Sequence, residues 1–99
     1  MRIAVEHHTS KETAREKLEE RLGQLVVQYG GREEDFESEW VGDTMRFKGK
    51  ALGFKVEGTI EVTDAEVILD GKLPLIANMF EGRVREAVAR EADAMFRTA

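Results

Sequence analysis

Two adjacent histidines, His7 and His8, are the first candidates for chemistry in this chain of 99 residues. Imidazole nitrogens bind transition metals, and a zinc site would need further ligands such as Glu6 or Glu12. The residues before the histidines alternate between polar and apolar, which predicts a strand whose neighbouring side chains point to opposite faces. The two imidazoles therefore do not converge, and we interpret them as the polar end of a strand that precedes a helix.

Ser10 follows the histidines, so a serine nucleophile beside a histidine base has to be considered. The segment from Thr9 to Glu12 also fits a capping box, in which Thr9 is the N-cap of a helix and Glu12 bonds back to it. No Gly-x-Ser-x-Gly or similar oxyanion-forming motif surrounds the serine. We therefore predict that Ser10 lies at the start of a helix and has no catalytic role.

Paired carboxylates perform general acid–base catalysis when their surroundings keep one protonated and the other ionised. Two pairs on predicted strands have a suitable spacing, Glu37 with Glu39 and Glu57 with Glu61. Both pairs fall on polar strand faces beside lysine or arginine side chains. This environment favours a charged surface ladder over a catalytic site.

Glu91 is the carboxylate that helical phase places within an apolar stripe, close to Val84 and Val88. A buried acid can serve catalysis, although structural ion pairs place acids in such positions as well. We expect Glu91 to reach outward at the helix end or to pair with an arginine such as Arg15 or Arg21.

The nine glycines do not form a phosphate-binding loop, because no Gly-Lys-Ser/Thr segment leads into a helix. Gly53 and Gly58 lie within a predicted strand, where they allow a bend or a bulge. The chain has no cysteine, which excludes disulfides, thiolate catalysis and sulfur ligation of a metal. The sequence therefore predicts no catalytic residue, no cofactor and no metal site.

A stretch from residue 52 to residue 73 dominates the predicted fold, because it has the period of two strands joined by a polar turn. Apolar and polar side chains alternate in its first eleven residues, so that one face is apolar and the other is charged. The apolar face carries Leu52, Phe54, Val56, Ile60 and Val62. A hairpin of this kind needs a second layer that covers its apolar face.

The other segments supply that layer and complete the sheet. Three further strands are predicted from alternating segments, namely residues 2–7 and the segments that begin at Phe36 and Met45. Two amphipathic helices follow from the 3.6-residue period, namely residues 10–29, which Gly30-Gly31 ends, and the segment from Pro74 to Arg97. The order strand, helix, four strands, helix predicts a two-layer α+β fold with an antiparallel sheet of about five strands, covered on one face by both helices.

The composition is that of one soluble globular domain spanning residues 1–99, with 41% apolar and 35% charged residues. The net charge of −5 argues against non-specific binding to nucleic acid and against binding to anionic lipid. No apolar run approaches the roughly 18 residues of a membrane span, and the N-terminus lacks the apolar core of a signal peptide. We therefore expect a cytoplasmic protein.

Three segments resemble a known family. They are residues 53–64 (GFKVEGTIEVTD), residues 67–73 (VILDGKL) and residues 75–84 (LIANMFEGRV). Together with a strand and a helix before them, they are similar to the putative polyhydroxyalkanoic acid system protein family. Its members are small bacterial proteins named for genes found beside polyhydroxyalkanoate synthesis genes. The resemblance implies a non-catalytic, cytoplasmic accessory role in storage-polyester metabolism or at the polyester granule, with granules or granule proteins as partners, and it brings no catalytic residues.

An apolar shoulder at the start of the second helix is the candidate contact surface for such a partner. It consists of Pro74, Leu75 and Met79, which lie off the stripe that faces the core, and Phe96 is a second apolar residue in the same situation. Two interpretations stay open for these residues. They either close the end of the core or form an exposed patch that meets a granule or a partner protein.

An alternative function is a small apolar-ligand module, because the layout also resembles a shortened helix-grip fold, which often holds such a ligand beside its long helix. Gly58 and Gly71 face inward in the predicted phase and leave space for an acyl chain. A domain of this size needs most of its apolar area for its own stability, which argues against a large cavity. Self-association through an edge strand is compatible with either function.

Overall fold

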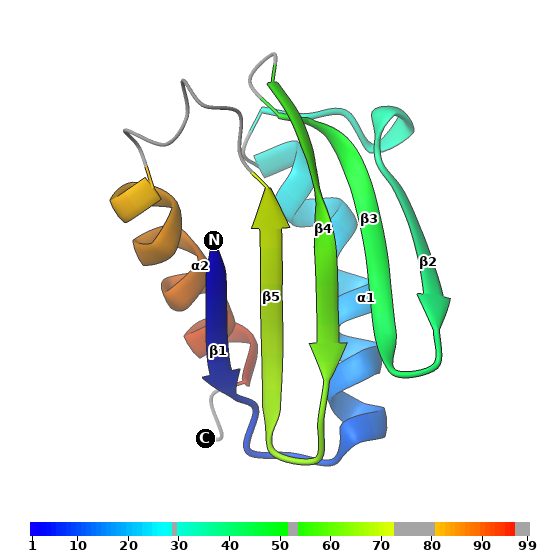
Figure 1. Ribbon diagram of the computed structural model, residues 1–99, viewed down its shortest axis with the longest axis vertical. Helices are drawn as coiled ribbons and strands as arrows, with labels where there is room; N and C mark the ends of the chain where they lie inside the picture. Colours follow the sequence, from blue (N-terminus) through cyan, green and yellow to red (C-terminus); the bar gives the residue numbers. More distant parts are fainter. Residues whose placement is uncertain (29, 52–53, 73–80, 97–99) are drawn as a thin grey trace.

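The computed structural model describes residues 1–28, 30–51, 54–72 and 81–96, and it confirms the predicted α+β order (Figure 1). A short 3₁₀ turn, η1, adds to the predicted elements. The elements are β1 (Arg2–Glu6), α1 (Lys11–Gln28), η1 (Glu33–Asp35), β2 (Glu37–Val41), β3 (Thr44–Ala51), β4 (Phe54–Val62), β5 (Glu66–Lys72) and α2 (Glu81–Phe96).

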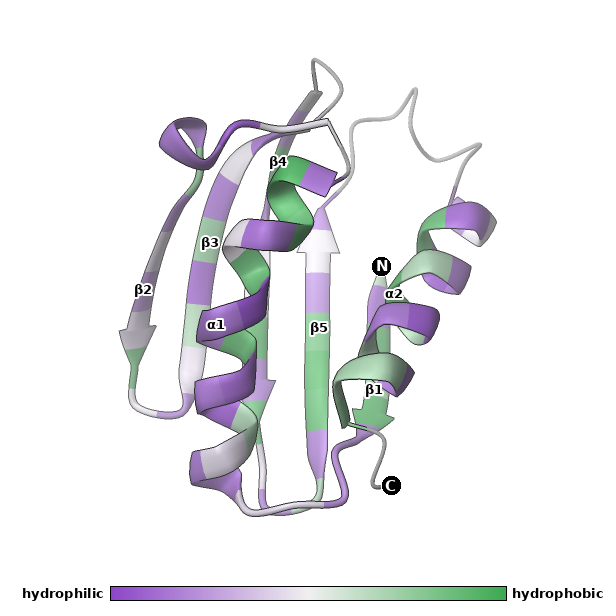
Figure 2. Cartoon of the chain, turned by 180° about the vertical axis from the view of Figure 1, so that it is seen from behind, coloured by the Kyte–Doolittle hydropathy of each residue, from purple (hydrophilic) through white to green (hydrophobic). Residues whose placement is uncertain are grey.

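The five strands form one antiparallel sheet in the order β1-β5-β4-β3-β2. The β4–β5 hairpin therefore lies inside the sheet, while β1 and β2 are its edges. Figure 2 shows both helices in front of the same face of the sheet, with α1 in front of β3 and β4 and α2 in front of β1. This face is called the inner face, and the opposite one, which neither helix covers, is called the outer face.

The core lies between the inner face and the two helices. One row of apolar side chains crosses four strands, because the register pairs Met45 with Ile60, Ile60 with Leu69 and Leu69 with Ile3. Among the described residues, the buried apolar ones are Ala14, Leu18, Met45, Ile60, Val62, Val67 and Phe96. Fully burying a side chain of leucine size stabilises the fold by about 1.5–3 kcal/mol, so this cluster is the main reason that the helices stay on the sheet.

The two ends of α1 have well-defined caps. At the start, the Ser10 hydroxyl accepts a hydrogen bond from the Thr13 amide at 3.1 Å, so Ser10 is the N-cap and the prediction of Thr9 was wrong by one residue. The Thr9 amide instead donates to the His7 ring at 3.2 Å, which holds it outside the helix. At the end, Gly30 has a positive φ of 88° and its amide bonds back into the last turn, as predicted for a helix that ends at glycine.

The helix α2 packs beside β1 and is tied to α1 by polar contacts. Arg21 lies 3.4 Å from a carboxylate oxygen of Glu91, and the Gln28 amide donates to the other oxygen at 3.3 Å. Of the alternatives left open for Glu91, pairing with an arginine is the one that the structure shows, and the arginine is Arg21. The expected start of the second helix at Pro74 lies outside the described residues. None of the described helices is both long enough and apolar enough to span a membrane.

Candidate functional site

His7, the first candidate for metal binding, has a structural role. It is 1% exposed, and one ring nitrogen, Nε2, donates a hydrogen bond to the Thr63 carbonyl at 2.8 Å. The other nitrogen, Nδ1, accepts from the Thr9 amide, so both nitrogens of the neutral ring are used. His8 is exposed and does not join it. The two histidines do diverge as predicted, but the burial of His7 under the turn between β4 and β5 was not expected.

A charged cluster joins the start of α1 to two turns of the sheet. The Lys11 ammonium lies 3.0 Å from Asp43 and 3.6 Å from Asp64, and Arg15 lies 3.4 Å from Asp43. The hydrogen bond and charge of Asp43, helped by Asp64, raise the pKa of Lys11 above 10.5. The Arg15 guanidinium also stacks 4.3 Å from the Trp40 ring centre. These contacts fix α1 on the sheet, and no motif in the sequence indicated them.

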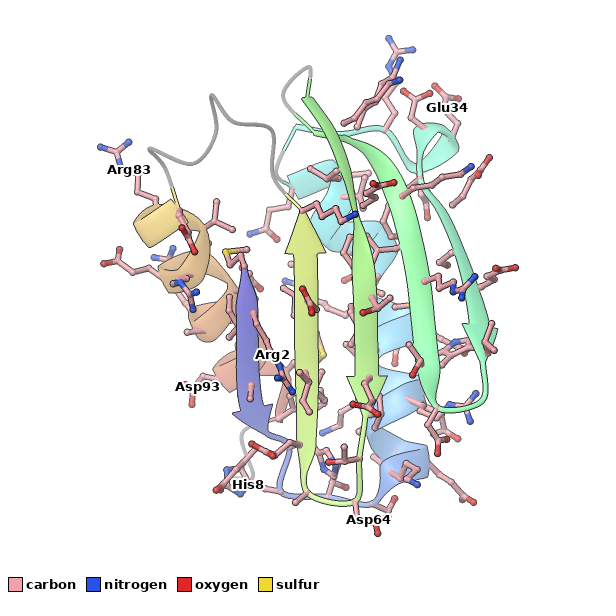
Figure 3. The ribbon with its side chains drawn as sticks, in the orientation of Figure 1. Arg2, His8, Glu34, Asp64, Arg83 and Asp93 are labelled. Carbon is pink, nitrogen blue, oxygen red and sulfur yellow. The ribbon has the colours of Figure 1, made fainter. Side chains whose placement is uncertain are left out.

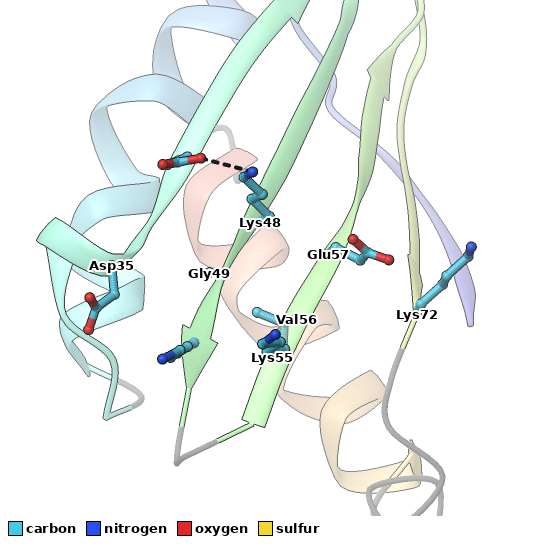
Figure 4. A pocket seen from close by; sticks show the side chains of 9 residues that line it. Asp35, Lys48, Gly49, Lys55, Val56, Glu57 and Lys72 are labelled. Carbon is cyan, nitrogen blue, oxygen red and sulfur yellow. Dashed lines mark ion pairs between the residues drawn. The ribbon is translucent and has the colours of Figure 1, made fainter.

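The outer face of the sheet carries rows of alternating charge, as predicted for Glu37, Glu39 and Glu57, whereas Glu61 faces Thr44 and Ile68. One row crosses four strands, because Glu37 pairs in register with Lys48, Lys48 with Glu57 and Glu57 with Lys72. Lys48 and Glu37 form an ion pair at 3.3 Å (Figure 4). Opposite charges placed directly across strands stabilise a sheet, so these carboxylates form a charged ladder.

A second row of alternating charge lies two residues further along the strands. Glu39 faces Arg46, Arg46 faces Thr59, Thr59 faces Asp70, and Asp70 faces Arg2. Figure 3 shows Arg2 on the side of the sheet that looks away from the helices. Each cation in this row therefore has an acid or a hydroxyl as its cross-strand neighbour.

The alternation fails at the end of the face nearest the β3–β4 connection. Lys50 and Lys55 are direct cross-strand partners there, and both side chains are exposed. Neither forms an ion pair within the parts of the chain that the structure describes. Like charges directly opposite each other destabilise a sheet, so this pair is a local conflict, as is the pair of Glu6 and Glu66 across β1 and β5. Sequence reasoning missed it, because the register that joins the two lysines is not visible in the sequence.

Two open hollows of about 510 and 700 Å³ lie on this part of the outer face. The described residues that line the first are lysines and acids with Gly49 and one aliphatic residue, Val56 (Figure 4). The two hollows are contiguous, since both are lined by Glu37, Lys48, Glu57 and Lys72. An open depression lined by charged side chains suits charged groups better than an acyl chain, which needs an enclosed apolar site.

The space expected on the inner face beside Gly58 and Gly71 is largely filled. The two glycines do face inward and pair directly with each other across β4 and β5. A Cβ on Gly58 would lie 3.1 Å from the ring of Phe47, and it would collide with the backbone of β5. A Cβ on Gly71 would have one neighbour, the Glu57 carbonyl at 3.8 Å, so room remains there alone.

The structure describes one of the four apolar residues that the sequence suggested as a contact surface. Pro74, Leu75 and Met79 lie outside the described residues. Phe96 is 2% exposed and its ring centre lies 6.2 Å from that of His7, so it belongs to the core and is not a contact residue. The last turn of α2 faces the sheet, which is why a residue off the main stripe is buried. Among the described residues, no three histidine, aspartate or glutamate side chains are grouped as a metal site.

Comparison with known proteins gives one match. The family model described as putative polyhydroxyalkanoic acid system protein covers residues 1–96. This span includes every described strand and helix, from β1 to α2. No curated protein matches the chain, and no solved structure matches it either.

Proposed function

Because the chain belongs to the putative polyhydroxyalkanoic acid system protein family, we propose that it is a non-catalytic accessory protein of polyhydroxyalkanoate storage-polyester metabolism. It acts by binding at the polyester granule, on a protein that the granule carries. The observation that supports this function is the family match across residues 1–96. The charged outer face of the sheet supports binding, and not chemistry, as the mode of action.

The side chains that could perform chemistry have structural partners. Both nitrogens of His7 bond to the backbone, Ser10 caps α1, and Glu91 joins α1 to α2. A general base or a nucleophile must be free to approach a substrate atom. Because these side chains already have structural roles, they favour a protein that binds without catalysis.

The outer face of the sheet is the surface that such a partner would meet. The apolar sides of both helices pack on the inner face, whereas the outer face presents two rows of matched charges and two open hollows. A strongly charged face is a poor surface for adsorption to bare polyester, because its charged groups would lose water without gaining partners. A granule protein with complementary charges fits this face better.

Affinity capture from a polyester-accumulating host tests the proposal. The tagged chain is recovered separately from the granule and soluble fractions, beside a culture of the same host that makes no polyester. We expect enrichment with granule proteins in the accumulating culture, and loss of it in Arg46→Glu/Lys48→Glu, which reverses two outer-face charges. Arg83→Glu/Arg90→Glu on α2 is the matched control and keeps the enrichment. Equal recovery from both cultures would contradict the proposed function.

A further inference from the structure

We propose that the end of the outer face around Lys50 and Lys55 binds a phosphate group of a small soluble ligand. The inference goes beyond granule association and does not depend on it. It rests on the register of β3 and β4, on the hollow beside the two lysines, and on the balance of charge around them.

The lysine pair is unusual for this surface and for this chain. The protein has a net charge of −5, and every other cation in the described strand pairs of its outer face lies opposite an acid or a hydroxyl, although Glu6 also lies opposite Glu66. Two ammonium groups placed directly across strands repel each other and lower the stability of the sheet. Local conflicts of this kind are concentrated at functional sites, where a ligand relieves them.

Four lysines and three acids line the hollow, so its net charge is about +1, and the excess positive charge is concentrated on Lys50 and Lys55. Lys48 pairs with Glu37, and Lys72 lies beside Glu57 in register, so these two cations are already balanced. Lys50 and Lys55 form no ion pair with an acid within the described residues. A phosphate monoester carries close to two negative charges on one centre, whereas a carboxylate carries one. A phosphate group therefore matches the uncompensated pair.

The hollow itself favours a compact, hydrophilic anion. Its volume of about 510 Å³ accommodates a phosphate or a diphosphate, and the described residues that line it include one aliphatic side chain, Val56. Lysine binds phosphate as a mobile point charge and needs no glycine-rich loop, so the absence of that motif from the sequence does not bear on this site. Asp35 also lines the hollow, and its carboxylate opposes the ligand.

Titration of the purified, isotope-labelled protein with inorganic pyrophosphate tests the site. We expect saturable shifts of backbone amide resonances in β3 and β4, weakened when sodium chloride is raised from about 0.02 to about 0.2 M. Inorganic phosphate should shift the same resonances, and succinate should bind about tenfold more weakly, because its two charges lie on separate centres. Equal binding of succinate and phosphate would overturn the assignment to a phosphate group.

Two different lysine variants test whether binding depends on Lys50 and Lys55, so an unstable variant still leaves a second test. Lys50→Gln/Lys55→Gln should weaken pyrophosphate binding about tenfold or more, whereas Arg83→Gln/Arg90→Gln, which removes two exposed charges from α2, should not. Lys50→Glu replaces the repulsion by an opposite pair, so it should raise Tm by about 1–5 °C and still abolish binding. Asp35→Asn should strengthen binding about threefold. Shifts that persist unchanged in both lysine variants would overturn the proposal.

Discussion

Gly58 and Gly71 are a matched pair of inward-facing glycines, and replacing each by alanine should have opposite results. A Cβ on Gly58 would lie 2.8 Å from the Gly71 Cα and closer still to the Asp70 carbonyl oxygen, both of which are backbone atoms. The first distance is 0.6 Å short of the 3.4 Å at which ordinary contact begins. Backbone atoms in the middle of a sheet cannot rotate away, so β4 and β5 must separate and strain the hydrogen bonds between them.

The size of the effect follows from that strain. Overpacking a core position costs about 1–3 kcal/mol, and for a domain of this length each kcal/mol lowers Tm by about 4–8 °C. Gly58→Ala should therefore lower the free energy of unfolding by about 2 kcal/mol or more. Gly71→Ala meets one atom at 3.8 Å, an ordinary contact, and it removes the flexibility of glycine from the unfolded chain. It should be neutral or stabilise by about 0.5 kcal/mol.

Urea denaturation measures both variants against the wild-type protein. The fluorescence of Trp40, the single tryptophan, reports the transition because its ring is half-buried beside Arg15 and adjoins the core. The midpoint should fall for Gly58→Ala and should stay or rise for Gly71→Ala. Equal destabilisation by the two substitutions would refute the register of β4 with β5 and the tighter packing that it gives Gly58.

Three further predictions concern the caps and contacts at the start of α1. Ser10→Ala should cost about 1 kcal/mol in chemical denaturation, while Thr9→Ala should cost less than half of that, and the reverse order would restore Thr9 as the N-cap. Lys11→Gln should lower Tm at pH 7 to 9. This difference from wild type should shrink as the pH rises above about 10.5. Asp43 raises the pKa of Lys11 in the folded state, so the stabilisation is lost when the ammonium deprotonates. A difference that is independent of pH would contradict an ionic role for Lys11. His7→Phe should cost about 1–3 kcal/mol in thermal unfolding, because two partly buried backbone groups lose their partners, and a cost below about 0.5 kcal/mol would show that those bonds contribute little.

The order of the elements could be predicted from the sequence because each long segment has a clear period. The alternation from Leu52 to Val62 indicated β4, and the 3.6-residue spacing of Ala14, Leu18 and Leu22 indicated α1. Both patterns arise from burial of one face, and the family resemblance covered the same segments. The boundary at Ser10 was missed by one residue, since two adjacent hydroxyl residues both suit an N-cap and a tertiary bond to His7 decides between them.

The charges of the candidate site could be predicted only in part. Alternation within each strand placed the glutamates on the outer face, and it was enough to favour a ladder over catalysis. The Lys50–Lys55 pair depends on which residues of β3 and β4 meet, and that register is set by packing across the sheet. The burial of Phe96 likewise depends on the position of α2 above β1, which helical phase alone does not give.

Granule binding is tested most simply by how the native protein distributes between the granule fraction and the soluble fraction. Granules are isolated by density centrifugation from the chain's own host during polyester accumulation, and the protein is quantified by mass spectrometry in the granule and soluble fractions. A binding accessory of the polyester system should be enriched on granules relative to abundant soluble proteins and should leave that fraction when granule proteins are stripped with high salt. A protein that stays wholly soluble throughout accumulation, and captures no granule protein, would contradict the account.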